Sequence, residues 1–177
     1  SWPIEAVIHS HCAPDHPRWP SAEDMTGQSA TGVPWGIIYT DGEAASSPLW
    51  FGDHTLDEKM IGRSFVPGVY DCYALIRAWY WQNKHIKLPE FARDANWWQA
   101  GGDLFRDGFK RAGFCKIETD PHPGDVVLMQ LRSHVPNHSA VMIEDGLMIH
   151  HLENRLSRRE PLNRWRRKIT HVLRYKS

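Results

Sequence analysis

The chain has 177 residues, a length that suits one domain of ordinary size or one domain with an extra fragment. Its 21 basic and 21 acidic side chains balance, so the net charge gives no reason to expect a nucleic-acid partner. Three cysteines argue against a disulfide framework. No apolar run approaches a membrane span or forms a signal peptide, so we expect no membrane insertion. Because the first residue is not Met, we expect a processed or truncated product.

The N-terminal stretch combines a predicted strand with residues that bind metals. Residues 4–8 are rich in β-branched side chains and predict a short strand that leads into His9 and His11. Two histidines at i and i+2 on a strand point to one face, so both imidazoles can bind one ion. Ser21 marks a capping-type helix start, and Asp24 supplies a third, oxygen ligand.

This order, His-x-His followed by Ser-x-x-Asp, resembles the JAMM metalloproteases. The resemblance implies zinc ligands His9, His11 and Asp24, with Ser21 beside the zinc-bound water. The family's general base is a glutamate from well upstream, and the only upstream carboxylate here, Glu5, lies about 13 Å from His9 along a strand. We therefore expect a partial JAMM-like α/β segment that holds zinc without that catalytic chemistry. A strand and loop with solvated histidines is the alternative.

The stretch from Asp41 to Phe65 is mixed in composition, first rich in Gly, Ser and Pro and then charged. Such a composition is typical of a linker. We predict three parts: the partial JAMM-like segment over residues 1–50, a linker over 51–60 and a second domain over 61–177.

A predicted helix from Asp71 to about Lys84 opens the second domain. Asp71 is a good N-cap, because its carboxylate can accept the free amide hydrogens of the first turn. Cys72 then lies in that turn, where the partial positive charge of the helix end favours a thiolate and predicts a depressed thiol pKa. Such a cysteine is a candidate nucleophile if a histidine reaches it. A buried structural cysteine is the alternative.

Short elements are predicted for the rest of the chain. Trp97 and Trp98 precede a second helix with one apolar stripe, which ends at Gly113. The basic tail over residues 155–177 predicts a solvated face rather than a site for an anionic partner. Strands are predicted over 33–40, 126–131, 138–144, 147–151 and 171–175.

The turn between the strands over 138–144 and 147–151 decides which histidines share a face. A two-residue turn puts His150 on the opposite face from His138 and favours His151. A three-residue loop pairs Ala140 with His150, which then shares the face of His138. Gly146 suits the left-handed position that this loop requires, so we predict His150, with His151 in reserve.

A cysteine at a helix start, a histidine at a strand start and a second histidine across a hairpin form a Cys-His-His order. With twelve positions from His138 to His150 and Pro-Gly-Asp over 123–125, it resembles the NlpC-type murein endopeptidases. The resemblance implies an α+β, papain-like fold, in which the helix bearing Cys72 packs on an antiparallel sheet. It also implies that Cys72 is the nucleophile, His138 the general base and His150 the residue that orients His138, with no cofactor.

The residues around the cysteine depart from the family pattern. The small residues that usually follow the cysteine are replaced by Tyr73 and Ala74, and Tyr70 is too close to be the upstream tyrosine of many members. We therefore expect a different acyl-binding pocket, with the backbone amide of Cys72 as the one assigned oxyanion donor.

Both motifs in this order resemble the tail assembly K group of lambda-like phages, in which a JAMM-like domain precedes an NlpC-like one. That resemblance extends over further stretches, including residues 88–91, 135–138 and 156–160. It implies a tail-tip endopeptidase that is made in the host cytoplasm, carried in the virion and active in the host periplasm. The implied partners are peptidoglycan stem peptides and other phage tail-tip proteins.

Two other functions remain open. One is a zinc-dependent JAMM-type peptidase that uses His9, His11 and Asp24. The other is a non-catalytic structural tail-tip module that keeps the Cys-His-His residues. The bond cleaved is open as well, between the D-glutamyl–diaminopimelate link and the D-alanyl–diaminopimelate cross-link.

Overall fold

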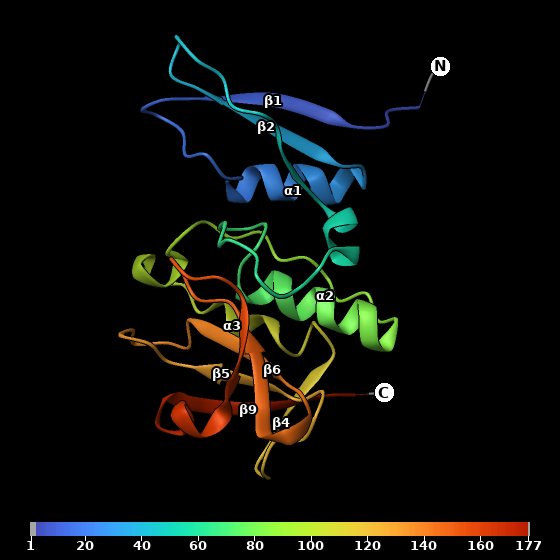
Figure 1. Cartoon of the computed structure of the whole chain (residues 1–177), viewed down its shortest axis with the longest axis vertical. Coiled ribbons are helices and arrows are strands. Elements are labelled where there is room, and N and C mark those ends of the chain that lie inside the picture. The colour runs from blue at the N-terminus through green and yellow to red at the C-terminus, as the bar shows by residue number, and fades with distance from the viewer. Residues whose placement is uncertain (1–2, 177) are drawn as a thin grey trace.

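The structure is a computed structural model that describes residues 3–176. A three-stranded sheet lies in the N-terminal part and a six-stranded sheet in the C-terminal part, with α1 and α2 between them (Figure 1). No described helix is long and apolar enough to cross a membrane. The strands are β1 Val7–Cys12, β2 Trp35–Thr40, β3 Leu49–Phe51, β4 Phe114–Ile117, β5 Val126–Met129, β6 His138–Met142, β7 Leu147–His150, β8 Arg158–Pro161 and β9 Ile169–Tyr175. The α-helices are α1 Ala22–Thr31, α2 Cys72–Lys84 and α3 Leu104–Gly108, and the 3₁₀ helices are η1 Asp53–Asp57, η2 Trp97–Ala100, η3 Glu144–Gly146, η4 Leu162–Arg164 and η5 Arg166–Lys168.

The N-terminal sheet is a β1-α1-β2 unit with one added strand. β1 and β2 are parallel, and β3 pairs with β2 antiparallel. The pairing of β1 starts with Val7 opposite Trp35 and continues to Cys12 opposite Thr40. The predicted strand over 4–8 is therefore too early, because the ladder that defines the strand extends through both histidines of the motif.

The segment over 51–60, expected as a linker, is ordered and packs against α2. Asp53 of η1 forms an ion pair with Arg77 of α2 at 2.8 Å. Asp57 accepts a hydrogen bond from the indole of Trp81 at 2.7 Å. These contacts join the N-terminal part to the helix that carries the cysteine.

Helix α2 begins at Cys72 and ends at Lys84, as the sequence predicts. Asp71 caps its N-terminus and accepts the amide hydrogen of Ala74 at 2.9 Å. The same carboxylate accepts two hydrogen bonds from the buried guanidinium of Arg93, at 2.7 and 3.0 Å. A buried ion pair therefore fixes the start of the helix that bears the cysteine.

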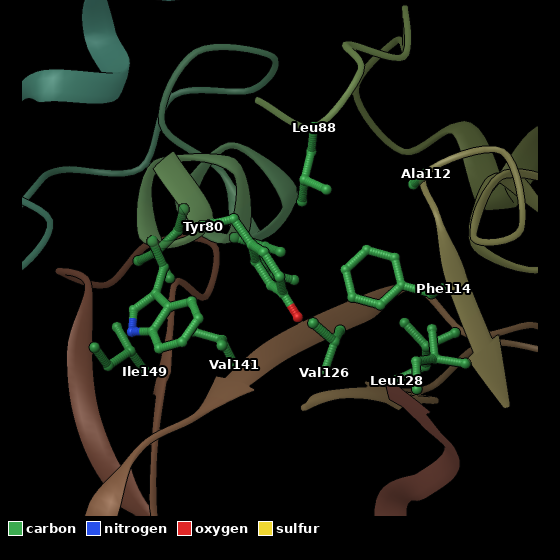
Figure 2. Packing of buried hydrophobic residues seen from close by; sticks show 12 residues of the cluster. Tyr80, Leu88, Ala112, Phe114, Val126, Leu128, Val141 and Ile149 are labelled. Atoms are coloured by element: carbon green, nitrogen blue, oxygen red, sulfur yellow. The ribbon is translucent and has the colours of Figure 1, made fainter. Parts of the chain in front are cut away.

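The six-stranded sheet is antiparallel throughout, in the order β4-β9-β5-β6-β7-β8. Val141 and Ile149 belong to the main hydrophobic cluster together with Tyr80 of α2 (Figure 2). Ala140 and Met148 belong to a second cluster, because successive residues of a strand point to opposite faces. The α+β arrangement of a helix on an antiparallel sheet is the papain-like fold that the sequence predicts.

The turn between β6 and β7 is the three-residue segment Glu144–Gly146 (η3), which a backbone hydrogen bond of 2.9 Å from Ile143 to Leu147 closes, and it fixes the pairing of the two strands. Asp145 and Gly146 have positive φ values of 61° and 67°. Ala140 lies opposite His150 in the ladder. The three-residue alternative, with its pairing of these two residues, is confirmed.

Other predicted elements differ from the structure. The helix expected after Trp98 is split into η2 and α3, because Gly101 ends η2 in the left-handed conformation with φ of 86°. β9 begins at Ile169, two residues earlier than predicted. The strands β3, β4 and β8 were not predicted, since three or four residues are too few for a clear alternation.

Candidate active site

A cavity of about 910 Å³ lies at the N-terminus of α2. Cys72, the first residue of α2, and His138, the first residue of β6, both line it. The fold therefore brings the predicted nucleophile and the predicted base to one cavity. Three tryptophans, Trp97, Trp98 and Trp165, are among its apolar lining residues.

The thiol of Cys72 is harder to ionise than the sequence predicts. Burial, followed by the negative charge of Asp71, raises the pKa of the Cys72 thiol to about 11. Neighbouring groups of Ser139 and the positive charge of Arg93 lower this pKa by less. The predicted depression of the pKa is therefore wrong for the resting site, because loss of hydration outweighs the helix end.

His138 and His150 form a buried pair beside the cavity. Nε2 of His138 lies 3.0 Å from Nδ1 of His150, so Nδ1 of His138 takes no part in this contact. Burial, followed by the charges of neighbouring histidines, lowers the pKa of His138 to about 3. Burial also lowers the pKa of His150. Both imidazoles are therefore neutral at pH 7.

His151, the reserve candidate, lies elsewhere in the same cavity. Its ring is 1% exposed and packs edge-on against Phe65, with centroids 5.2 Å apart. Among residues 3–176 it makes no hydrogen bond to His138. The structure therefore places His150, rather than His151, against His138.

Glu160 extends the histidine pair, and the sequence did not point to it. Its Oε2 lies 3.5 Å from Nε2 of His150 and accepts a hydrogen bond from the indole of Trp165 at 2.7 Å. The residue belongs to β8, whose sequence Arg-Arg-Glu-Pro has no apolar alternation. Only the pairing of β8 with β7, which the sequence does not show, reveals this contact.

His9, His11 and Asp24 converge in the N-terminal part. The two Nε2 atoms are 3.1 Å apart and lie 3.1 and 3.2 Å from the carboxylate oxygens of Asp24. The carbonyl of Pro17 accepts the Nδ1 hydrogen of His11 at 2.7 Å, which leaves the lone pair on Nε2. Ser21 caps α1 and donates its hydroxyl hydrogen to Asp24 at 2.8 Å.

These three side chains fit a zinc ion. Two imidazole nitrogens and one carboxylate oxygen are ligands that zinc accepts, with a fourth position left for water. Nδ1 of His9 is buried and has no hydrogen-bond partner in the described part of the chain. The facing Nε2 atoms of His9 and His11 would both be satisfied by a cation. Glu5 is exposed before β1 and forms no ion pair within residues 3–176.

Comparison with known proteins agrees with this geometry. The sequence pattern of the NlpC/P60 family matches residues 53–174. Tail tip assembly protein K of Escherichia phage lambda is 34% identical over 174 residues, which cover 96% of this chain and 80% of that protein. Tail tip assembly protein K of Escherichia phage N15 is 29% identical over 181 residues, which cover 98% of this chain and 70% of that protein.

Solved structures show weaker similarity. The NlpC/p60 domain of peptidoglycan hydrolase SagA is 14% identical, with a TM-score of 0.42 over 68% of this chain and 93% of that one. An NlpC/P60 family protein from Bacillus cereus is 17% identical, with a TM-score of 0.46 over 89% of this chain and 41% of that one. These scores are low, so the assignment rests on the sequence matches. Since the family match over residues 53–174 spans more than half of the sequence, the chain belongs to the NlpC/P60 family, and it is homologous to phage tail tip assembly protein K.

Proposed function

We propose that the chain is a phage tail-tip endopeptidase that cleaves peptidoglycan stem peptides in the host periplasm through a Cys-His-His thiol mechanism. The observation that carries this proposal is that Cys72 and His138 line the same cavity. His138 is in turn hydrogen-bonded to His150. Similarity to tail tip assembly protein K supports a place in the virion and other tail-tip proteins as partners.

The proposed reaction starts from a neutral thiol and a neutral imidazole. The sulfur of Cys72 attacks the scissile carbonyl while its proton passes to Nδ1 of His138, because a free thiolate is not populated at a pKa of about 11. The backbone N–H of Cys72, in the first turn of α2, stabilises the oxyanion. His138 then gives its proton to the leaving amine as the C–N bond breaks, and water hydrolyses the thioester.

Digestion of purified peptidoglycan and of defined muropeptides tests this mechanism. Wild type and Cys72→Ala are each incubated with and without a chelator, and the products are identified by mass spectrometry. We expect cleavage by wild type that is insensitive to the chelator and absent in Cys72→Ala. The fragment masses distinguish the D-glutamyl–diaminopimelate link from the D-alanyl–diaminopimelate cross-link. No cleavage in any sample would favour a structural tail-tip module.

A second function rests on the convergence of His9, His11 and Asp24. We propose that these residues bind one zinc ion. The ion would link β1, which carries the two histidines, to the first turn of α1, which carries Asp24. Zinc at such a site can also polarise a carbonyl or activate water. Cleavage that survives Cys72→Ala and stops with a chelator would assign the peptidase activity to this site.

A further inference from the structure

Glu160 lies on the far side of His150 from His138. Its carboxylate is mostly buried, at 14% exposure, and both of its oxygens are engaged. Oε2 accepts the indole hydrogen of Trp165 at 2.7 Å, and Oε1 pairs with the guanidinium of Arg158 at 2.5 Å. Both oxygens of this carboxylate therefore act as hydrogen-bond acceptors.

A carboxylate acceptor beside Nε2 bears on which nitrogen of His150 carries the proton. Nε2 of His150 is buried and makes no hydrogen bond among the described residues, but Oε2 of Glu160 lies 3.5 Å from it, and the charge of this carboxylate favours the neutral ring with its hydrogen on Nε2. Nδ1 of His150 then carries a lone pair and accepts a hydrogen bond from Nε2 of His138 at 3.0 Å. His138 consequently has its own lone pair on Nδ1, the nitrogen that the proposed mechanism assigns to the thiol.

The opposite arrangement would disable the base. If the hydrogen of His150 were on Nδ1, it would point at Nε2 of His138 and move the hydrogen of His138 to Nδ1. His138 would then present an N–H, rather than a lone pair, to Cys72. Both arrangements satisfy the contact between the two rings, so the selection comes from outside the pair.

We propose that Glu160 is a positioning residue that sets the proton arrangement of His150 and His138 and so keeps His138 ready to accept the proton of Cys72. This inference rests on the proposed cysteine mechanism and adds a fourth member to it. When the S–H bond breaks and the Nδ1–H bond of His138 forms, the new positive charge is stabilised through His150 by the carboxylate. Glu160 itself neither gains nor loses a proton.

The variant that tests this role is Glu160→Gln in the full chain. Glutamine keeps the size of the side chain and an oxygen for the indole of Trp165, but it removes the charge. Glu160→Asp restores the charge on a shorter side chain. Glu144→Gln, in the exposed loop before β7, is the matched control.

Two measurements decide the outcome, and neither depends on peptidoglycan. Nitrogen NMR of the histidine rings reports which nitrogen carries the hydrogen, and alkylation by iodoacetamide, followed by mass spectrometry of the Cys72 peptide, reports thiol reactivity across pH. We expect Nε2–H on both rings in wild type, a changed tautomer in Glu160→Gln, and alkylation at pH 7 that is slower by about 10- to 100-fold. Glu160→Asp should recover most of this loss, and Glu144→Gln should match wild type.

Unchanged tautomers and unchanged alkylation in Glu160→Gln would overturn the inference. Should that variant fold poorly, Trp165→Phe provides a second check, because it removes a donor to Glu160 but keeps the charge and is expected to keep the wild-type tautomers. If His138→Ala leaves the alkylation of Cys72 unchanged, the proposed mechanism fails, while the tautomers in wild type and Glu160→Gln still decide the role of Glu160.

Discussion

Ala140 of β6 lies directly opposite His150 of β7. Because His138 precedes Ala140 by two residues, it lies on the same face as His150, and their ring nitrogens approach to 3.0 Å. His151, the next residue along the chain, packs against Phe65 instead. The length of one hairpin turn therefore decides which of two adjacent histidines lies against His138.

Replacement of these two histidines should separate their roles. We expect His150→Ala to lower kcat/KM on a muropeptide by about 100-fold or more, since it removes the ring that orients His138. His151→Ala should lower it by less than about 10-fold, because its ring does not contact the base. Steady-state kinetics on both variants checks this, and equal losses would contradict the assignment.

Activity should not fall near the usual pKa of histidine. Burial holds the pKa of His138 at about 3, so the neutral base persists far below pH 6.5. We expect kcat/KM to stay level between about pH 5 and 8, with circular dichroism used to confirm that the protein is folded. A decline centred near pH 6.5 would show that the free site contains a histidine of ordinary basicity.

The same burial should make stability depend on pH. The folded-state pKa values of His138 and His150 lie below the unfolded value, so between the two the unfolded chain binds more protons. Their contribution to stability is complete above about pH 6.5 and is lost as the pH falls toward 3, by up to about 1.4 kcal/mol per pH unit for each histidine. Urea unfolding at several pH values measures the slope, which His138→Gln should reduce.

The ion pair at the start of α2 should be important for stability. Arg93→Ala leaves the buried carboxylate of Asp71 without its partner, and we expect a loss of about 3–5 kcal/mol in the free energy of unfolding. Arg106→Ala is the control, because Arg106 is half-exposed and its pair with Asp103 is worth no more than about 1 kcal/mol. Urea unfolding compares the two variants, and similar losses would refute the importance of burial.

Metal content tests the N-terminal site. The full chain, dialysed against zinc and then against metal-free buffer, should retain one zinc ion per chain by elemental analysis. His11→Ala should lose it, because the ring of His11 supplies one of the three ligand atoms. His16→Ala should keep it, since the ring of His16 packs beside His11 but is not among those ligands. Equal zinc in His11→Ala and wild type would rule the site out.

Local signals were sufficient for the cysteine helix and the hairpin. The cap at Asp71 and the apolar spacing behind Cys72 lie within one segment, so they predict where α2 begins. The glycine at position 146 likewise predicts the loop that pairs Ala140 with His150. In both cases, the residues that determine the geometry are neighbours in sequence.

Properties that depend on distant residues could not be predicted in this way. The pKa of Cys72 is raised by burial, which results from the packing of separate segments around the thiol. Glu160 reaches His150 only because β8 pairs with β7, and a four-residue strand rich in charge gives no sequence signal. The apolar stripe after Trp98 predicts one continuous helix, because the stripe carries on past Gly101. The structure instead ends η2 at that glycine.

The contacts of η1 with α2 bear on how the chain can be divided. Removing residues 1–60 would take away Asp53, which pairs with Arg77, and Asp57, which accepts the indole hydrogen of Trp81. It would also remove the carbonyl of Leu56, which accepts a hydrogen bond from Gln82 of α2 at 2.6 Å. The helix that bears Cys72 would lose support on the side facing away from the sheet. Segment η1, which lies inside the family match over residues 53–174, therefore supports the helix that bears Cys72, and a chain cut at residue 60 is expected to be less stable than the full chain.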